Sequence, residues 1–121
     1  MMKLGIMMIF VTDLSVAKDF YCGVLGFRLL SEDGNRLEFE HPGSRFVAYK
    51  CKTNGNVEAY STAARSVFVF EVTSIEEWVR EMRSKGVRFL HDEPAENEFS
   101  RYAAFVDPFG NVHEVYEPKN R

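Results

Sequence analysis

The sequence predicts an α+β fold in which one βαβββ unit occurs twice along the chain. The first observation is a repeat with a spacing of roughly 60 residues, because segments 8–14 and 25–30 recur as 68–75 and 85–90. The second is the order of the patterns, since each copy shows a strand, a turn, a helix, a glycine and a strand. A unit of this length cannot bury its apolar face alone, so the two copies are expected to pack together and leave a cleft. We expect the function to lie in that cleft.

The first copy opens with a strand and a helix. Residues 4–11 are apolar on both faces, which predicts a strand that is covered on both sides. Residues 12–15 supply cap-forming side chains, and the apolar positions within 16–24 have helical spacing. The helix is expected to end near Gly23 or Gly26, because glycine readily takes the left-handed conformation that ends helices.

Three further strands complete the first copy. Residues 27–31 are predicted to form the first of them, and the turn signal at 32–35 leads into an alternating strand at 36–40. A second turn at 41–44 precedes the last strand, at 45–51. This order gives the unit its βαβββ pattern.

The second copy shows the same order of elements, and its first strand is followed by a helix. One face of its helix is apolar and the opposite face is charged, which is typical of a helix that packs on a sheet; the apolar residues are Ile75, Trp78, Val79 and Met82. A strand at 87–90 and an acidic loop at 91–98 follow. The last two strands, 101–106 and 112–117, are joined by a turn at 107–111.

We therefore expect a single domain over residues 1–121, made of modules at about 1–52 and 66–118. Residues 53–65 contain many polar side chains and Gly55, a composition typical of a linker. A chain of 121 residues can bury a core, but it is small enough that dimerisation often adds stability.

Composition excludes several classes of function. Hydrophobic residues make up 45% and charged residues 27% of the chain, as in soluble globular domains. The net charge is −3 and no basic run occurs, so neither nucleic acid nor a membrane is an expected partner. No apolar run reaches the roughly 18 residues of a membrane span, and residues 1–11 make a poor signal peptide. We predict a cytoplasmic protein in which Cys22 and Cys51 are reduced thiols.

Short motifs in a fixed order cover essentially the whole chain. They are Val11-Thr12-Asp13-Leu14, Phe20-Tyr21, Leu25-Gly26-Phe27, Phe70-Glu71-Val72, Lys85-Gly86-Val87, and the segment 104–111 running into Glu114. This pattern resembles the vicinal oxygen chelate superfamily, which includes glyoxalase I, extradiol dioxygenases, fosfomycin-resistance transferases and bleomycin-resistance proteins. The resemblance implies two βαβββ modules whose sheets form an incomplete mixed-sheet barrel around a central cavity, often completed by a homodimer partner.

The resemblance also implies where a catalytic metal would be bound. In metal-dependent members a divalent ion such as Zn, Ni, Mn or Fe is held by His or Glu and chelates two neighbouring oxygens of the substrate. The corresponding positions in this sequence are Ile6, Val67, Tyr49 or Cys51, and Glu114. Only Glu114 matches an expected ligand, and one carboxylate does not make a metal site. We therefore expect no metal and no other cofactor.

Strand alternation predicts the lining of the cavity. The expected lining is apolar and aromatic with two carboxylates: Ile6, Met8, Phe10, Tyr49, Val67, Val69, Glu71, Glu114 and Tyr116. Glu71 and Glu114 are the candidate catalytic residues, because a carboxylate on an apolar floor can serve as a general base or bind a cationic group. The alternative is that they reach solvent or pair with Arg45 or Arg101. His113 is expected to point away from Glu114.

The sequence thus favours a homodimer that binds a small, partly apolar molecule without a catalytic metal, as bleomycin-resistance proteins do. One alternative is a metal-dependent lyase or dioxygenase of the glyoxalase kind, with Glu114 as one ligand. A second alternative is a metal-free acid–base enzyme that uses Glu71 or Glu114. Nothing in the sequence identifies the ligand.

Overall fold

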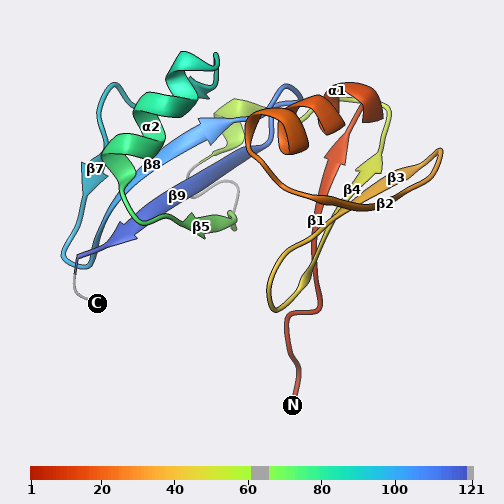
Figure 1. The fold of residues 1–121 in the computed structure, drawn as a ribbon, viewed down its shortest axis with the longest axis horizontal. Coiled ribbons are helices and arrows are strands. Elements are labelled where there is room, and N and C mark those ends of the chain that lie inside the picture. Colours follow the sequence, from red (N-terminus) through yellow and green to blue (C-terminus); the bar gives the residue numbers. More distant parts are fainter. Residues whose placement is uncertain (61–65, 120–121) are drawn as a thin grey trace. The chain divides into compact units, whose positions relative to one another are not determined.

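The chain divides into two compact units in the computed structural model of the protein, which describes residues 1–60 and 66–119. One unit is Met1–Gly55 and the other is Asn56–Arg121. Each combines helix with a mixed sheet, as Figure 1 shows, and the predicted α+β class is confirmed. Residues 61–65 of the predicted linker lie outside the described part of the chain.

The first unit has the predicted order of a strand, a helical segment and three strands. Its elements are β1 (Ile6–Val11), α1 (Leu14–Lys18), η1 (Asp19–Val24), β2 (Leu29–Glu32), β3 (Arg36–Phe39) and β4 (Arg45–Lys50). The strands lie in the order β1-β4-β3-β2. β1 runs parallel to β4, whereas the other neighbours are antiparallel, so the sheet is mixed and β1 lies at one edge.

The helical segment of the first unit is a short α-helix followed by a π-helix, where the sequence predicts one continuous α-helix. Asp13 begins it, because its carboxylate accepts a hydrogen bond from the Val16 N–H at 3.1 Å. In the π-helix the Leu25 N–H donates to the Phe20 carbonyl at 2.9 Å, which widens the turn. Gly26, with a φ of 89°, follows the segment, in agreement with the predicted end.

β1 buries one of its two apolar faces. Met7, Ile9 and Val11 are buried, and the same core contains an aromatic cluster of Tyr21, Phe27, Phe39 and Phe46. The alternate side chains are exposed, by 41% at Ile6, 40% at Met8 and 54% at Phe10. Within the first unit, therefore, only one face of this strand is covered, whereas the sequence predicts cover on both. The helical segment packs on one face of this sheet, and alternate side chains of β1 point to the opposite face.

The second unit begins with a short 3₁₀ helix in the segment expected to be a linker. Its elements are η2 (Val57–Ala59), β5 (Val69–Glu71), α2 (Ile75–Ser84), β6 (Arg88–Phe89), β7 (Ala95–Glu96), β8 (Ser100–Val106) and β9 (Val112–Pro118). The sheet has the order β5-β9-β8-β6, with β5 parallel to β9. The acidic loop contains one element that the sequence does not predict, because β7 pairs with β8.

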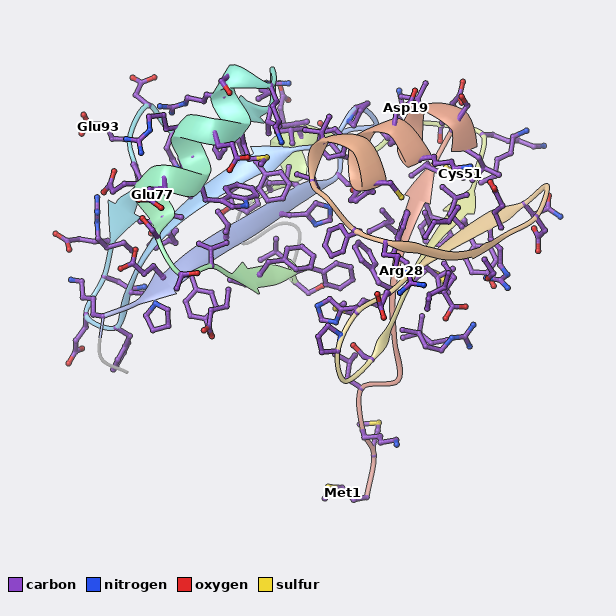
Figure 2. All side chains as sticks on the ribbon, viewed as in Figure 1. Met1, Asp19, Arg28, Cys51, Glu77 and Glu93 are labelled. Carbon is purple, nitrogen blue, oxygen red and sulfur yellow. The ribbon has the colours of Figure 1, made fainter. Side chains whose placement is uncertain are left out.

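Helix α2 covers one face of the second sheet (Figure 1). Ser74 caps it, and Ile75, Val79 and Met82 are buried, as the apolar stripe predicts. Trp78 lies among aromatic rings, with its ring centre 6.0 Å from that of Phe89 and 5.2 Å from that of Phe105. Figure 2 labels the charged Glu77 on this helix and Glu93 on the loop after β6. The candidate site lies on the face of the sheet opposite α2.

The structure also shows the state of the two cysteines and the lengths of the helices. Cys22 and Cys51 are free thiols. Burial raises the pKa of the Cys22 thiol, so it stays protonated and poorly nucleophilic at neutral pH. No helix within residues 1–60 and 66–119 is both long and apolar enough to span a membrane.

Candidate functional site

The candidate site lies on the face of the second sheet that α2 does not cover. On β9, His113 and Val115 are buried in the core on the α2 side, so Glu114 and Tyr116 point to the opposite face. This confirms the prediction that His113 and Glu114 point in opposite directions. The register places Tyr102 of β8 directly beside Tyr116.

A cavity of ≈ 690 Å³ occupies this face. It is lined by Tyr60, Val69, His91, Asn97, Ser100, Tyr102, Glu114 and Tyr116, all of which belong to the second unit. Its volume lies in the range of small-molecule sites in proteins, which is roughly 300–1,000 Å³. The polar groups of the lining are one carboxylate, one imidazole, one amide, one serine hydroxyl and three phenols.

Tyr60 and Glu114 form the central contact of the cavity. The Tyr60 hydroxyl donates a hydrogen bond to Oε2 of Glu114. Burial, followed by this hydrogen bond and the negative charge of Glu114, raises the pKa of Tyr60. Tyr60 therefore keeps its proton at neutral pH, and Glu114 acts as the acceptor. Asn56 holds the start of η2 in place, because its Oδ1 accepts from the Glu58 N–H at 3.0 Å.

A second tyrosine and glutamate meet at the edge of the cavity. The Tyr116 hydroxyl donates to Oε1 of Glu71 at 2.9 Å. β5 runs parallel to β9, and the register places Glu71 beside Tyr116, which explains how the two side chains meet. Both of these tyrosines thus direct their hydroxyl protons at carboxylates.

The loop between β6 and β8 forms a wall of the cavity. His91 stands edge-on to Tyr102, with ring centres 6.4 Å apart, and its carbonyl accepts from the Arg83 guanidinium at 2.6 Å. Asn97 orders the far end of the loop, because its Oδ1 accepts from the Phe99 and Ser100 N–H groups at 2.8 Å each. Both His91 and Asn97 therefore line the cavity from fixed positions.

The structure brings some of the predicted cavity residues together in the second unit. Val69, Glu114 and Tyr116 line the cavity, Glu71 contacts Tyr116, and Val67 lies just before β5. Their role in binding or catalysis stays a prediction. Ile6, Met8, Phe10 and Tyr49 belong to the first unit, where the register of β1 and β4 puts Phe10 beside Tyr49.

The arginines proposed as partners for the two glutamates contact other residues instead. Arg45 pairs with Glu38 through two hydrogen bonds of 3.0 and 2.7 Å. Arg101 pairs with Glu76 on α2, on the other side of the sheet. Glu114 receives the phenol of Tyr60 in their place.

Several lining residues were not predicted from the sequence. Tyr60 lies in the segment that was assigned to the linker, and His91 and Asn97 lie in the acidic loop. Ser100 and Tyr102 share their face with Tyr116, and this could be found by counting outward from the β8–β9 turn.

The donor atoms at the positions of the expected metal site do not fit a divalent ion. Ile6 and Val67 carry no donor atom, and Glu114 already accepts a hydrogen bond from Tyr60. Within residues 1–60 and 66–119, no group of three or more His, Cys, Asp or Glu side chains lies close enough to hold a metal. We derive no chemical step through a metal.

The sequence and the fold are similar to those of known proteins. A sequence model of the Glyoxalase/Bleomycin resistance protein/Dioxygenase superfamily matches residues 3–115. The fold is similar to that of TnmS3, an antibiotic binding protein from Streptomyces sp. CB03234, with a TM-score of 0.73 and 21% identity over 98% of each chain. No curated protein matches the sequence significantly.

Two further solved structures show the same fold. A glyoxalase/bleomycin resistance protein/dioxygenase from Alicyclobacillus acidocaldarius has a TM-score of 0.75 and 21% identity over 98% of this chain and 92% of its own. Another from Nocardioides has a TM-score of 0.77 and 20% identity over 99% of this chain and 85% of its own. At such identities the likeness concerns the fold alone.

Proposed function

Because the chain belongs to the Glyoxalase/Bleomycin resistance protein/Dioxygenase superfamily, we propose that it binds a small, partly apolar molecule in the cavity of its second unit. The proposal includes binding without a catalytic metal. The observation that carries it is the hydrogen bond from Tyr60 to Glu114 inside a cavity of suitable volume. This bond engages the one carboxylate that matches an expected metal ligand.

The residues that line the cavity favour ligand binding over catalysis. Tyrosine rings give a ligand large, rigid contact surfaces, and their hydroxyl groups fix its orientation. The raised pKa of Tyr60 makes its phenol unsuited to exchange protons near neutral pH. The metal-dependent lyase alternative would need further ligands in addition to Glu114. TnmS3, which has the same fold, is described as an antibiotic binding protein.

We further propose that the protein is a cytoplasmic homodimer. The composition described above supports the cytoplasmic location. For the dimer, the support is the open face of β1, where Ile6, Met8 and Phe10 expose apolar surface at a sheet edge. A second copy of the chain is the occupant that we propose for this face.

The binding proposal can be tested on the intact chain. We would purify the protein without a chelator and measure its metal content, then treat it with a chelator and titrate it with one-ring aromatic compounds while following backbone amide signals by NMR. We expect a low metal content and shifts concentrated at Tyr60, Tyr102, Glu114 and Tyr116. Tyr102→Ala should weaken binding, whereas Tyr49→Ala, the matched change in the first unit, should leave it unchanged.

Two results would contradict the proposal. A metal content approaching one ion per chain, or binding that needs added Zn, Ni, Mn or Fe, would show that the metal-free reading is wrong. Shifts that avoid the cavity residues would show that the ligand binds elsewhere.

A further inference from the structure

We propose that the cavity selects organic cations, meaning molecules in which a protonated amine or a quaternary ammonium group is attached to an aromatic or apolar body. This inference rests on the proposed function, because it names the ligand class of the same cavity. Three features of the lining lead to it: the direction of the hydroxyl protons, the distribution of charge, and the number of aromatic rings.

The hydroxyl protons of two cavity tyrosines point at carboxylates. A tyrosine has one hydroxyl proton, and Tyr60 and Tyr116 donate theirs to Glu114 and Glu71. The phenol oxygens of Tyr60 and Tyr116 therefore offer the ligand lone pairs and no proton. A carboxylate has about four acceptor positions, so one hydrogen bond from Tyr60 leaves Glu114 able to accept others. The polar groups around this contact consequently favour a ligand that donates hydrogen bonds.

The charge of the lining is negative. Glu114 lines the cavity, and no lysine or arginine is among its described lining residues. The neighbouring arginines are engaged elsewhere: Arg101 pairs with Glu76 on α2, and Arg83 donates to the His91 carbonyl and lies 5.2 Å from the centre of the Phe89 ring. An anionic ligand would meet the charge of Glu114 without a counter-charge from Lys or Arg, whereas a cation would be attracted to it.

Aromatic rings supply the third feature. Tyr60, Tyr102 and Tyr116 all line the one cavity, and Val69 adds apolar surface. The face of an aromatic ring is negative, so it attracts an ammonium group and at the same time excludes water from the apolar part of the ligand. Contacts of this kind contribute about 0.5–2 kcal/mol, depending on how far the cation is desolvated. Acceptors, a carboxylate and phenol rings thus all favour the same class of ligand.

Three one-ring compounds of closely similar shape but different charge provide the test. They are phenethylamine, 2-phenylethanol and phenylacetate, each titrated at millimolar concentration into the full chain and followed by amide NMR. We expect the amine to bind about tenfold tighter than the alcohol, which corresponds to about 1.4 kcal/mol. The carboxylate should bind more weakly than the alcohol.

Variants assign the preference to the glutamates. Glu114→Gln keeps an oxygen that can accept from Tyr60 but removes the charge, so the preference for the amine over the alcohol should fall to within about twofold. Glu71→Gln, at an exposed position, should lower the preference for the amine in part. It provides the test if Glu114→Gln does not fold. Glu77→Gln is the matched control, because Glu77 is exposed on α2 and should leave the preference unchanged.

The outcomes separate this inference from the proposed function. If the alcohol binds as tightly as the amine, the cation preference is wrong, while binding in the cavity stands. If the amine is preferred but both Glu114→Gln and Glu71→Gln keep the full preference, the assignment to these carboxylates is wrong. If none of the three compounds shifts any cavity residue, the cation inference fails, and the wider aromatic series described above then decides whether the proposed function fails with it.

Discussion

The Tyr60 hydroxyl donates a hydrogen bond to the carboxylate of Glu114, although the two residues are 54 positions apart in the sequence. Tyr60 lies next to a 3₁₀ helix that precedes the sheet, and Glu114 lies on β9 within it. This hydrogen bond therefore connects a segment outside the sheet to a strand that lines the cavity. In this hydrogen bond the phenol of Tyr60 carries the proton and the carboxylate of Glu114 accepts. The proposed ligand class depends on this arrangement.

Removing this hydroxyl should destabilise the second unit. Tyr60→Phe deletes a hydrogen bond to a charged group, and we expect the free energy of unfolding to fall by about 1–2 kcal/mol. Urea denaturation followed by circular dichroism measures the change. Tyr102→Phe is the matched control in the same cavity, because its hydroxyl forms no hydrogen bond within the described residues, and it should cost less than Tyr60→Phe. Equal losses in the two variants would show that the Tyr60 contact contributes little.

His113 should make the stability depend on pH. Burial lowers the pKa of His113 to about 4, although the charge of Asp107 acts in the opposite direction. The ordinary value is about 6.5, so between these values the unfolded chain binds a proton that the folded chain does not. The contribution is therefore fully present above about pH 6.5 and is lost as pH falls toward 4, by about 3 kcal/mol in total.

A variant isolates this contribution from the titration of the carboxylates. His113→Phe removes the titrating group at a position surrounded by Phe68, Phe70 and Phe105. We expect its urea stability to fall less between pH 7 and pH 4.5 than that of the unmodified protein. An unchanged pH dependence in His113→Phe would mean that His113 does not remain neutral in the folded chain.

The turn between β8 and β9 should be sensitive to loss of its buried carboxylate. Oδ1 of Asp107 accepts from the Phe109 and Asn111 N–H groups at 2.9 and 2.8 Å, and Oδ2 accepts from the Asn111 side chain at 2.8 Å. Asp107→Ala leaves these buried donors without their acceptor, so we expect a loss of about 2–3 kcal/mol in urea denaturation. Asp92→Ala, on the exposed loop, should cost much less, and similar losses would contradict a special role of the turn.

The exposed face of β1 should determine the oligomeric state. Phe10→Glu places a charge on the proposed dimer surface and should give a monomer at micromolar concentration, measured by light scattering after size exclusion. Leu30→Glu is a matched control, because Leu30 of β2 is 53% exposed and Phe10 is 54% exposed. A dimer that survives Phe10→Glu would place the interface elsewhere. An unmodified protein that is monomeric would contradict the homodimer proposal.

Much of the fold follows from the period of the apolar residues. The stripe Ile75, Val79 and Met82 predicts which face of α2 is buried, and strand alternation predicts that His113 and Glu114 point in opposite directions. These features were predictable because each depends on neighbours within one element. The π-helix after α1 was not, since its widened turn depends on how Phe20 and Tyr21 fit the core of the first unit.

The cavity was less predictable, because loops supply a large part of its lining. Tyr60 comes from a polar, glycine-bearing stretch whose composition is typical of a linker, and neither propensity nor periodicity shows that it contacts Glu114. His91 and Asn97 are placed by contacts of the loop after β6, which have no sequence period. Tyr102 could be placed by counting from the Asp107 turn, since a hairpin fixes the strand register.

The fluorescence of Trp78 can report on the unfolding of the second unit. It is the single tryptophan, it belongs to the second unit, and its ring contacts the rings of Phe89 and Phe105. Tryptophan emission therefore follows the opening of the second unit alone, whereas far-ultraviolet circular dichroism sums the backbone signal of both units. Coincident transitions by the two probes would mean that the repeats unfold in one cooperative step, and separated transitions would give each repeat a stability of its own.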